Sequence, residues 1–225
     1  MLMAKLMQEI QRHRKVDFEL VFLAMDPGYD RENRDLIARN AADLGIPLTM
    51  FESSIFDEVN KADKGSCYLC ARMRRGHLYS KARGLGCNKI ALGHHYDDVI
   101  ETTLMGMLYG GQIRTMMPKL RSRNYGGMEL IRPMYLIREK DICAWRDYNG
   151  LHFLRCACSA ASETDGEEAS GTSSKRREIK KLIASLREIN PSVEANIFSS
   201  VENIDLDAVI AYKKDGKRIC FLDDY

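Results

Sequence analysis

The chain has 225 residues, of which 45% are hydrophobic and 29% charged, with a formal net charge of +2 and a mean hydropathy of −0.34. This composition excludes a disordered chain and is sufficient for a buried core in one or two domains. No apolar run approaches the roughly 18–20 residues of a membrane-spanning helix, and the N-terminus is amphipathic and soon charged, unlike a signal peptide. We therefore expect a soluble, cytoplasmic protein without a membrane partner.

The elements predicted in chain order alternate between helix and strand. Leu2, Leu6 and Ile10 lie at i, i+4 and i+8, which predicts a helix with one apolar face over residues 1–14. The same reasoning predicts strands over 18–24, 46–51 and 89–92, and helices over 31–44 and 70–85 that end at Gly45 and Gly86. This alternation predicts βαβ units in a doubly wound, mostly parallel α/β sheet.

The first predicted helix has no strand before it. In a doubly wound fold, such a helix is the crossover between two parallel strands. Either this helix packs alone, or a leading strand and the loop after it are missing from the sequence.

The second half of the chain is less regular. Short strands and turns are predicted over 112–135 around Tyr125-Gly126-Gly127, followed by a helix over 138–149. The polar segment 159–174 is predicted to be a mobile loop, and 175–188 a basic helix. A further helix follows from Pro191, and Asp215-Gly216 between two apolar runs predicts a hairpin.

Basic residues gather in two stretches although the whole chain is nearly neutral. Residues 72–83 contain Arg and Lys but no acid, and residues 112–138 contain a single acid, Glu129. Local basic patches suit a polyanionic partner. A solvated helix face is the alternative interpretation of each stretch.

The sequence Gly93-His94-His95-Tyr96-Asp97-Asp98 lies where a predicted strand gives way to a helix. Ligands bind at the carboxyl ends of strands in open α/β sheets, and a free helix N-terminus attracts phosphate. Paired histidines and aspartates there suit proton transfer or Mg²⁺ ligation. An ordinary helix cap formed by Asp97 or Asp98 is the alternative.

The seven cysteines form an odd set, which argues against a disulfide framework in a cytosolic chain. Cys67 and Cys70 form a C-x-x-C pair at a predicted helix start, where thiolate is favoured. Cys156 and Cys158 form a second pair far along the chain. A four-cysteine zinc site, a three-cysteine iron–sulfur cluster and unlinked buried thiols all fit this placement, whereas the remaining cysteines sit singly among apolar residues.

Several motifs occurring in one order resemble the tRNA 2-thiocytidine synthetase family of PP-loop ATP pyrophosphatases, which is related to tRNA-lysidine synthetases. The resemblance covers most of residues 1–203 and is carried by the following segments: Gly93 to Asp98, Cys67-x-x-Cys70-x-x-x-Arg74-Arg75-Gly76, Met107-Leu108-Tyr109-Gly110-Gly111, Arg132-Pro133 and Arg138-Glu139-Lys140-Asp141-Ile142. It implies an adenine nucleotide alpha hydrolase-like fold over 1–155, with 156–225 adding a cysteine-containing loop, basic helices and a tail packed on the same domain.

The resemblance also implies a reaction. ATP and Mg²⁺ would bind at Gly93, His94, His95 and Asp98, with Asp97 and Asp98 catalytic, and the C2 oxygen of a cytidine in a tRNA anticodon loop would be adenylated and replaced by sulfur. A [4Fe–4S] cluster held by Cys67, Cys70 and Cys156 would take part in the sulfur transfer. A cysteine desulfurase or another sulfide donor would supply the sulfur. A homodimer is a further assembly to consider. The residues implied in tRNA binding are Arg72, Arg74, Arg75, Arg114, Lys119 and Arg121.

Two departures from the family pattern bear on this interpretation. The family's phosphate loop, Ser-Gly-Gly-Lys-Asp-Ser, is absent, and in relatives it leads straight into a helix like that over residues 1–14. We therefore expect the first strand and phosphate loop of the domain to be missing. Cys156-Ala157-Cys158 also replaces the usual Cys-x-x-Cys. A catalytically inactive nucleotide- or RNA-binding module, an enzyme acting on another tRNA base, and a persulfide enzyme are the alternatives.

Overall fold

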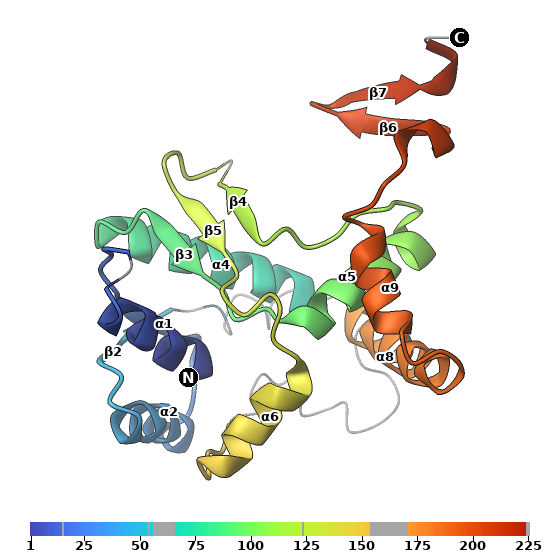
Figure 1. Ribbon diagram of the computed structural model, residues 1–225. Helices are drawn as coiled ribbons and strands as arrows, with labels where there is room; N and C mark the ends of the chain where they lie inside the picture. Colours follow the sequence, from blue (N-terminus) through green and yellow to red (C-terminus); the bar gives the residue numbers. More distant parts are fainter. Residues whose placement is uncertain (15, 54, 56–65, 123, 154–170, 224–225) are drawn as a thin grey trace.

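The computed structural model describes residues 1–14, 16–53, 55, 66–122, 124–153 and 171–223, without the side chains of 66–68 and 171–174 (Figure 1). Its helices are α1 (Leu2–Arg12), α2 (Arg31–Asp43), α4 (Ser66–Gly84), α5 (Tyr96–Gly110), α6 (Glu139–Tyr148), α8 (Gly171–Ile189) and α9 (Val193–Ser200). Its strands are β1 (Phe22–Asp26), β2 (Leu48–Glu52), β3 (Lys89–Ala91), β4 (Lys119–Arg121), β5 (Glu129–Ile131), β6 (Ala211–Lys214) and β7 (Lys217–Cys220).

Most predicted elements are present, and three boundaries were wrong. Strand β1 begins at Phe22 instead of residue 18, because its pairing with β2 runs only from Phe22 opposite Leu48 to Asp26 opposite Glu52. Helix α4 begins at Ser66, four residues before the predicted start, so the C-x-x-C pair lies in its first turns. Helix α8 begins at Gly171, inside the segment predicted to be a loop.

The strands form parallel pairs, as the alternating pattern predicts. β1 pairs in parallel with β2, β3 pairs in parallel with β5, and β4 runs antiparallel to β5. In the described ranges β1 and β3 belong to two different sheets, and a cavity of about 410 Å³ lies between them. Apolar side chains of β1, β3, α1 and α4 line this cavity, among them Met7, Leu23, Leu78 and Ile90.

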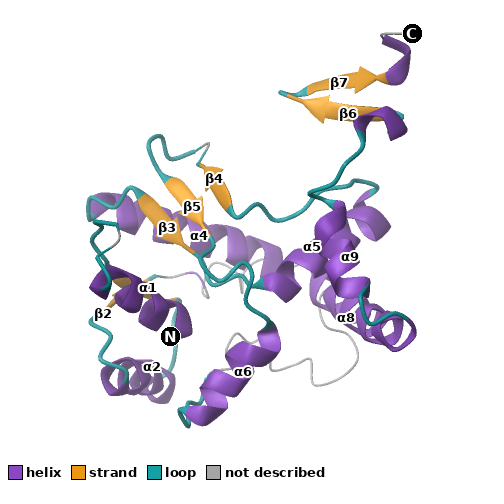
Figure 2. Ribbon diagram, viewed as in Figure 1, coloured by secondary structure: helices purple, strands orange, loops and turns teal. Residues whose placement is uncertain are grey.

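The C-terminal helices pack against α5. Val99 and Ile100 of α5 form one buried cluster with Ile179 and Ile183 of α8 and Phe198 of α9. The ring of Phe198 also stacks on that of Tyr96, with centroids 4.5 Å apart. This packing brings two helices from the end of the chain to the beginning of α5, as the arrangement of helices in Figure 2 shows.

The last strands form a hairpin that projects away from the rest of the molecule (Figure 1). β6 and β7 are antiparallel, and Asp215 and Gly216 join them with φ angles of 51° and 80°. Two consecutive positive φ values are typical of the tight hairpin turn that Asp-Gly predicts. Among the described helices, none is long and apolar enough to cross a membrane.

Candidate functional site

The candidate site is the loop between β3 and α5. β3 ends at Ala91, Gly93 is exposed, and His95 caps α5 with an extended backbone. The Asp98 carboxylate accepts a hydrogen bond from the His95 backbone N–H at 3.1 Å, so this aspartate is a capping residue, as the simpler interpretation of the motif predicts. The loop lies at the carboxyl end of a parallel strand, where a nucleotide can meet free backbone groups.

Asp97 connects α5 to the start of α6. Its carboxylate accepts a hydrogen bond from the Glu139 backbone N–H at 2.7 Å and pairs with the Arg138 guanidinium at 3.1 Å. Burial alone would raise the pKa of Asp97, but these two donors bring that pKa below its usual value. Asp97 therefore holds the N-terminus of α6, a role that its position in the sequence does not reveal.

Arg138 extends this contact to α9. Its guanidinium pairs with Glu194 at 2.7 Å and lies over the Tyr96 ring, 4.9 Å from the centroid. Glu194 is only 6% exposed and also pairs with Arg187 of α8. One arginine thus joins α5, α6 and α9 around a buried carboxylate.

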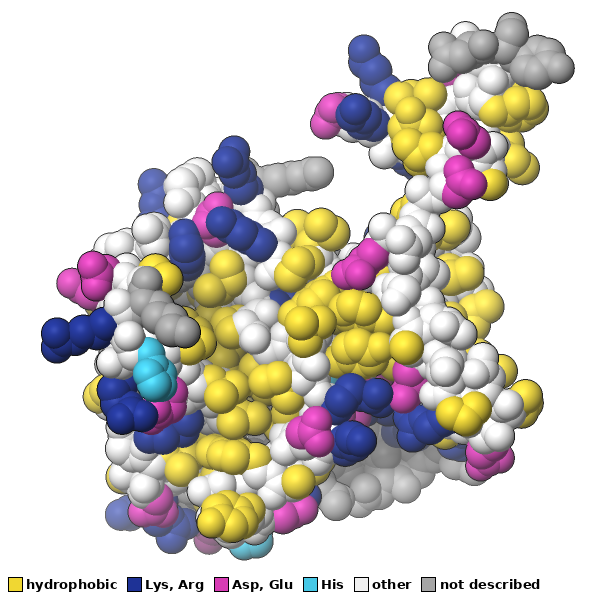
Figure 3. Space-filling view, in the orientation of Figure 1, with side chains coloured by type: hydrophobic (Ala, Val, Ile, Leu, Met, Phe, Trp, Pro, Cys, Tyr) yellow, Lys and Arg dark blue, Asp and Glu magenta, His cyan; other side chains and the backbone are white. Residues whose placement is uncertain are grey.

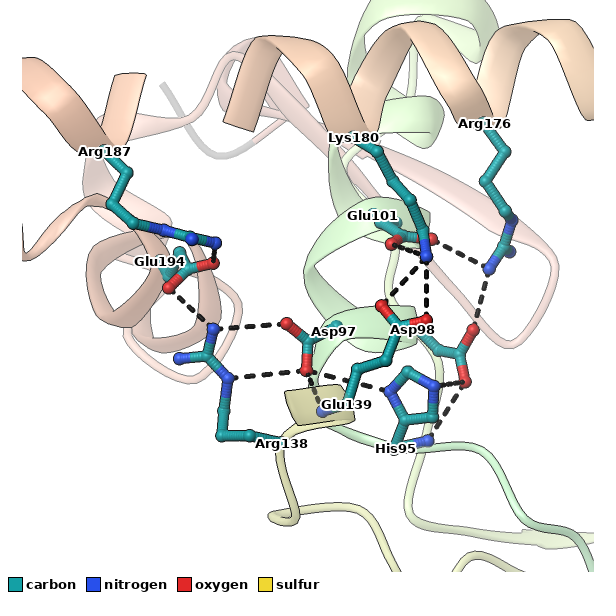
Figure 4. Close-up of polar contacts among 10 residues, drawn as sticks. All are labelled: His95, Asp97, Asp98, Glu101, Arg138, Glu139, Arg176, Lys180, Arg187 and Glu194. Atoms are coloured by element: carbon teal, nitrogen blue, oxygen red, sulfur yellow. Dashed lines mark hydrogen bonds and ion pairs between the residues drawn. The ribbon is translucent and has the colours of Figure 1, made fainter. Parts of the chain in front are cut away.

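Helix α8 supplies the cations that face Asp98 and Glu101 of α5 (Figure 4). Arg176 pairs with Asp98 at 2.8 Å and with Glu101 at 3.0 Å, and Lys180 lies 3.6 Å from Glu101. Glu101 is 2% exposed, and burial raises its pKa while the two cations oppose that rise. A Mg²⁺ ion at Asp98 would compete with Arg176 for the same carboxylate.

His94 belongs to a second polar group on the same loop. Arg132, which follows β5, donates from Nε to His94 Nδ1 at 3.2 Å, and its guanidinium also donates to the Met117 carbonyl. Burial lowers the pKa of His94, and the positive charges of Arg132, Arg176 and Arg75 lower it further against the opposing charge of Asp98. Arg75 of α4 therefore lies within electrostatic reach of this loop.

The predicted cluster ligands are only partly described. Cys67 and Cys70 lie in the first turns of α4, and the half-buried Cys70 packs against the core around Met25 and Ile55. The side chain of Cys67 and the whole of Cys156 lie outside the described residues, as does Cys158. Among the described side chains, no group of three or more His, Cys, Asp or Glu could hold a metal ion. The three-cysteine ligand set therefore stays a prediction.

The residues predicted to bind tRNA come from three parts of the fold. Arg72 and Arg75 are exposed on α4, and Arg74 is half-buried with its guanidinium 3.5 Å from the Tyr29 hydroxyl. The exposed Lys119 and Arg121 lie on β4, and Figure 3 shows Lys and Arg side chains gathered over this sheet. The remaining member of the set, also exposed, follows α5: Arg114.

The network around α5 contains residues that the sequence did not indicate as functional. The partners of Asp97 and Asp98 lie 42 and 78 positions away, at Glu139 and Arg176. No local spacing marks such pairs. The family-like segments at Arg132 and Arg138 were the available signal, since each places an arginine beside the predicted motif.

Comparison with known proteins defines the class first. The PP-loop domain family matches residues 1–162, which is more than half of the chain. Proteins named tRNA-cytidine(32) 2-sulfurtransferase are also similar. That of Syntrophotalea carbinolica is 32% identical over 88% of this chain and 74% of its own length, and that of Pelobacter propionicus is 33% identical over 88% and 72%. The chain belongs to this sulfurtransferase family of PP-loop transferases.

A solved structure confirms the fold. The U34-tRNA thiolase NcsA from Methanococcus maripaludis, solved with its [4Fe-4S] cluster, matches with a TM-score of 0.67 and 18% identity. The match covers 91% of this chain and 68% of that protein. The α/β fold with parallel strands and a helical C-terminal part, expected from the sequence, is therefore confirmed.

Proposed function

We propose that this protein is an ATP-dependent tRNA sulfurtransferase that replaces the C2 oxygen of an anticodon-loop cytidine with sulfur. The observation that carries the proposal is the β3–α5 loop. It presents Gly93, His94 and Asp98 at the carboxyl end of a parallel strand, in a chain about one-third identical to tRNA-cytidine(32) 2-sulfurtransferases. We place both chemical steps at this edge of the sheet.

The first step activates the base. The C2 oxygen attacks the α-phosphate of ATP, so an O–P bond forms and pyrophosphate leaves. Sulfur then attacks C2, and AMP leaves with the former carbonyl oxygen. Gly93 allows the backbone to approach the nucleotide, and His94 and His95 lie beside its phosphates. Asp98 is the residue that would hold Mg²⁺, and Arg176 would have to release its carboxylate first.

Asp97 has a structural role in the site. Its carboxylate is occupied by the Glu139 N–H and Arg138, so its contribution is to hold α5 and α6 together beneath the nucleotide. Of the two aspartates expected to be catalytic, we therefore propose a structural role for Asp97 and keep the catalytic role for Asp98. Asp98, whose ion-pair partner Arg176 has a side chain that is 37% exposed, is the better candidate metal ligand.

The donor chemistry of α4 fits an iron–sulfur cluster. Cys67 and Cys70 lie three residues apart in the first turns of the helix, where free N–H groups and the helix dipole stabilise thiolate. Together with Cys156 they would hold a [4Fe–4S] cluster, whose chemistry would be to carry the sulfur for transfer. A cysteine desulfurase or free sulfide would be the source of that sulfur.

The basic residues of α4 and β4 are proposed to hold the tRNA backbone. Arg75 lies within electrostatic reach of His94, so α4 brings positive charge to the edge of the site. The target base would be extruded from the anticodon loop, where bases are only partly stacked. We also propose a cytoplasmic protein and leave a homodimer as an assembly to test by light scattering.

The experiment is anaerobic reconstitution followed by a thiolation assay on unmodified tRNA. Wild-type protein should bind iron and sulfide. Fused after an apolar strand and a Ser-Gly-Gly-Lys-Asp-Ser loop, it should convert a cytidine to 2-thiocytidine in the presence of ATP and Mg²⁺, detected by mass spectrometry of nucleosides. Cys67→Ser, Cys70→Ser and Cys156→Ser should each lose the iron.

Cys158→Ser and Cys143→Ser are the matched controls and should retain it. Bound zinc, with equal loss at Cys156 and Cys158, would show a four-cysteine zinc site. A persulfide on one cysteine without bound metal would show the persulfide mechanism. Binding of tRNA without any thiolation would favour the non-catalytic module.

A further inference from the structure

His94 and Arg132 form a contact that the proposed reaction does not yet use. Arg132 Nε lies 3.2 Å from His94 Nδ1. A guanidinium nitrogen is always a donor and never an acceptor, so the Nδ1 atom that faces it accepts this hydrogen bond through its lone pair. A neutral imidazole that accepts at one nitrogen carries its proton at the other.

The surroundings of His94 keep the ring in this state. Four charged groups from separate elements act on it: Arg75 from α4, Asp98 from α5, Arg132 after β5 and Arg176 from α8. Three of these are cations, and burial and those cations together lower the pKa of His94. Adding a second proton would place another positive charge against Arg132, in a half-buried site.

The Nε2 atom is then a hydrogen-bond donor. Among the described residues, no protein group accepts a hydrogen bond from it. His94 directly follows Gly93 at the carboxyl end of β3, where the proposed function places the phosphates. A neutral ring that donates to an oxygen gaining negative charge is an established way to stabilise that charge without transferring a proton.

We propose that Arg132 is a positioning residue that holds His94 as a neutral ring with its proton on Nε2, so that His94 donates a hydrogen bond to a phosphate oxygen of the nucleotide. Only the identity of that acceptor rests on the proposed function. His94 is then unsuited to act as a general base through Nε2. Its neighbour His95 differs, since Asp97 and Asp98 lie 3.8 and 3.3 Å from its two ring nitrogens.

The state of the ring can be measured without activity. Two-bond proton–nitrogen correlation spectra of protein labelled with nitrogen-15 in its five histidines report which ring nitrogen carries a proton. In wild-type protein at neutral pH, His94, assigned from the His94→Gln spectrum, should show an unprotonated Nδ1 and a protonated Nε2. A protonated Nδ1 would overturn the proposal.

Substitutions of Arg132 should change the protonation state of the His94 ring to different extents. Arg132→Lys keeps the charge and a donor and should leave the ring neutral, whereas Arg132→Met should let it protonate at higher pH. Arg132→Glu replaces the donor with an acceptor and should place a proton on Nδ1. The His95 signals serve as the control for folding. Identical His94 titration in wild type, Arg132→Met and Arg132→Lys would overturn the proposal even if Arg132→Glu fails to fold.

Thiolation assays of His94 variants test the donor role of His94 separately from the proposed function. A glutamine side chain can place an amide N–H near the position of Nε2, so His94→Gln should retain more thiolation than His94→Asn. The reverse order would overturn the donor role. Absence of thiolation by the protein fused after the strand and the Ser-Gly-Gly-Lys-Asp-Ser loop would instead refute the proposed function and leave the ring measurement intact.

Discussion

Replacing Arg138 with methionine should destabilise the protein strongly, because this guanidinium pairs with the buried carboxylate of Glu194 and the half-buried carboxylate of Asp97. Glu194 is 6% exposed, and the Asp97 side chain is 14% exposed. Breaking a fully buried ion pair by removing one partner costs about 3–5 kcal/mol. The Arg138 side chain is 28% exposed, and Arg187 and the Glu139 N–H remain as partners, so we expect a loss of about 2–3 kcal/mol in the free energy of unfolding.

Urea unfolding followed by circular dichroism measures this loss, and Arg146→Met is the matched control. Arg146 lies on α6, the helix that Arg138 precedes as N-cap residue, but its partner Asp147 has a side chain that is 65% exposed, so we expect no measurable change. The pKa of Asp97 is below its usual value, so its ion pair stabilises the fold above the ordinary aspartate range. That stability is lost as the pH falls through the lowered pKa. The difference between wild type and Arg138→Met should therefore shrink in acid. Equal losses in the two variants, or a difference that grows in acid, would refute the reasoning.

Other predictions follow from the same site and from the basic residues. Burial raises the pKa of Glu101, so its ionisation lowers stability; the stability of wild type relative to Glu101→Gln should be greatest in acid and decline as the pH rises through the raised pKa, measured by urea unfolding across a pH series. Arg74→Glu with Arg121→Glu should weaken tRNA binding and reduce the slope of log affinity against log salt by roughly 2, as filter binding at several salt concentrations would show. Arg31→Glu, at a side chain that is 94% exposed on α2, is the control, and an unchanged slope in the double variant would place those arginines away from the tRNA.

Local signals in the sequence located most elements and the central motif. Gly45 and Gly86 end helices because each adopts a positive φ, 62° and 76°, that other residues avoid. The motif around His95 begins a helix after a parallel strand, as its polar and apolar pattern predicts. These features depend on a few neighbouring residues, so the sequence displays them directly.

Long-range contacts were not predictable in the same way. Strand β1 begins at Phe22 because its pairing with β2 begins there, opposite Leu48. The role of Asp97 depends on the backbone N–H of Glu139 in α6. The contact between Asp98 and Arg176 exists only because α8 packs its apolar face on α5. A spacing rule describes one element, whereas each of these depends on how two elements meet.

The cavity between β1 and β3 leads to a final prediction about the domain. Among the described residues each of these strands lies at the edge of its sheet, and apolar side chains of α1 and α4 line the space of about 410 Å³ between them. Strands of a parallel sheet that is covered by helices are expected to have apolar side chains buried on both faces. Leu23 of β1 and Ile90 of β3 are apolar, yet they are only partly buried. We propose that a further apolar strand fits between β1 and β3 and joins the two sheets. Fusing such a strand and the Ser-Gly-Gly-Lys-Asp-Ser loop to Met1 should protect the amides of β1 and β3 from hydrogen exchange and increase ATP binding. A matched fusion with the strand residues changed to serine should do neither. Equal exchange in the two fusions would show that the cavity does not take a strand.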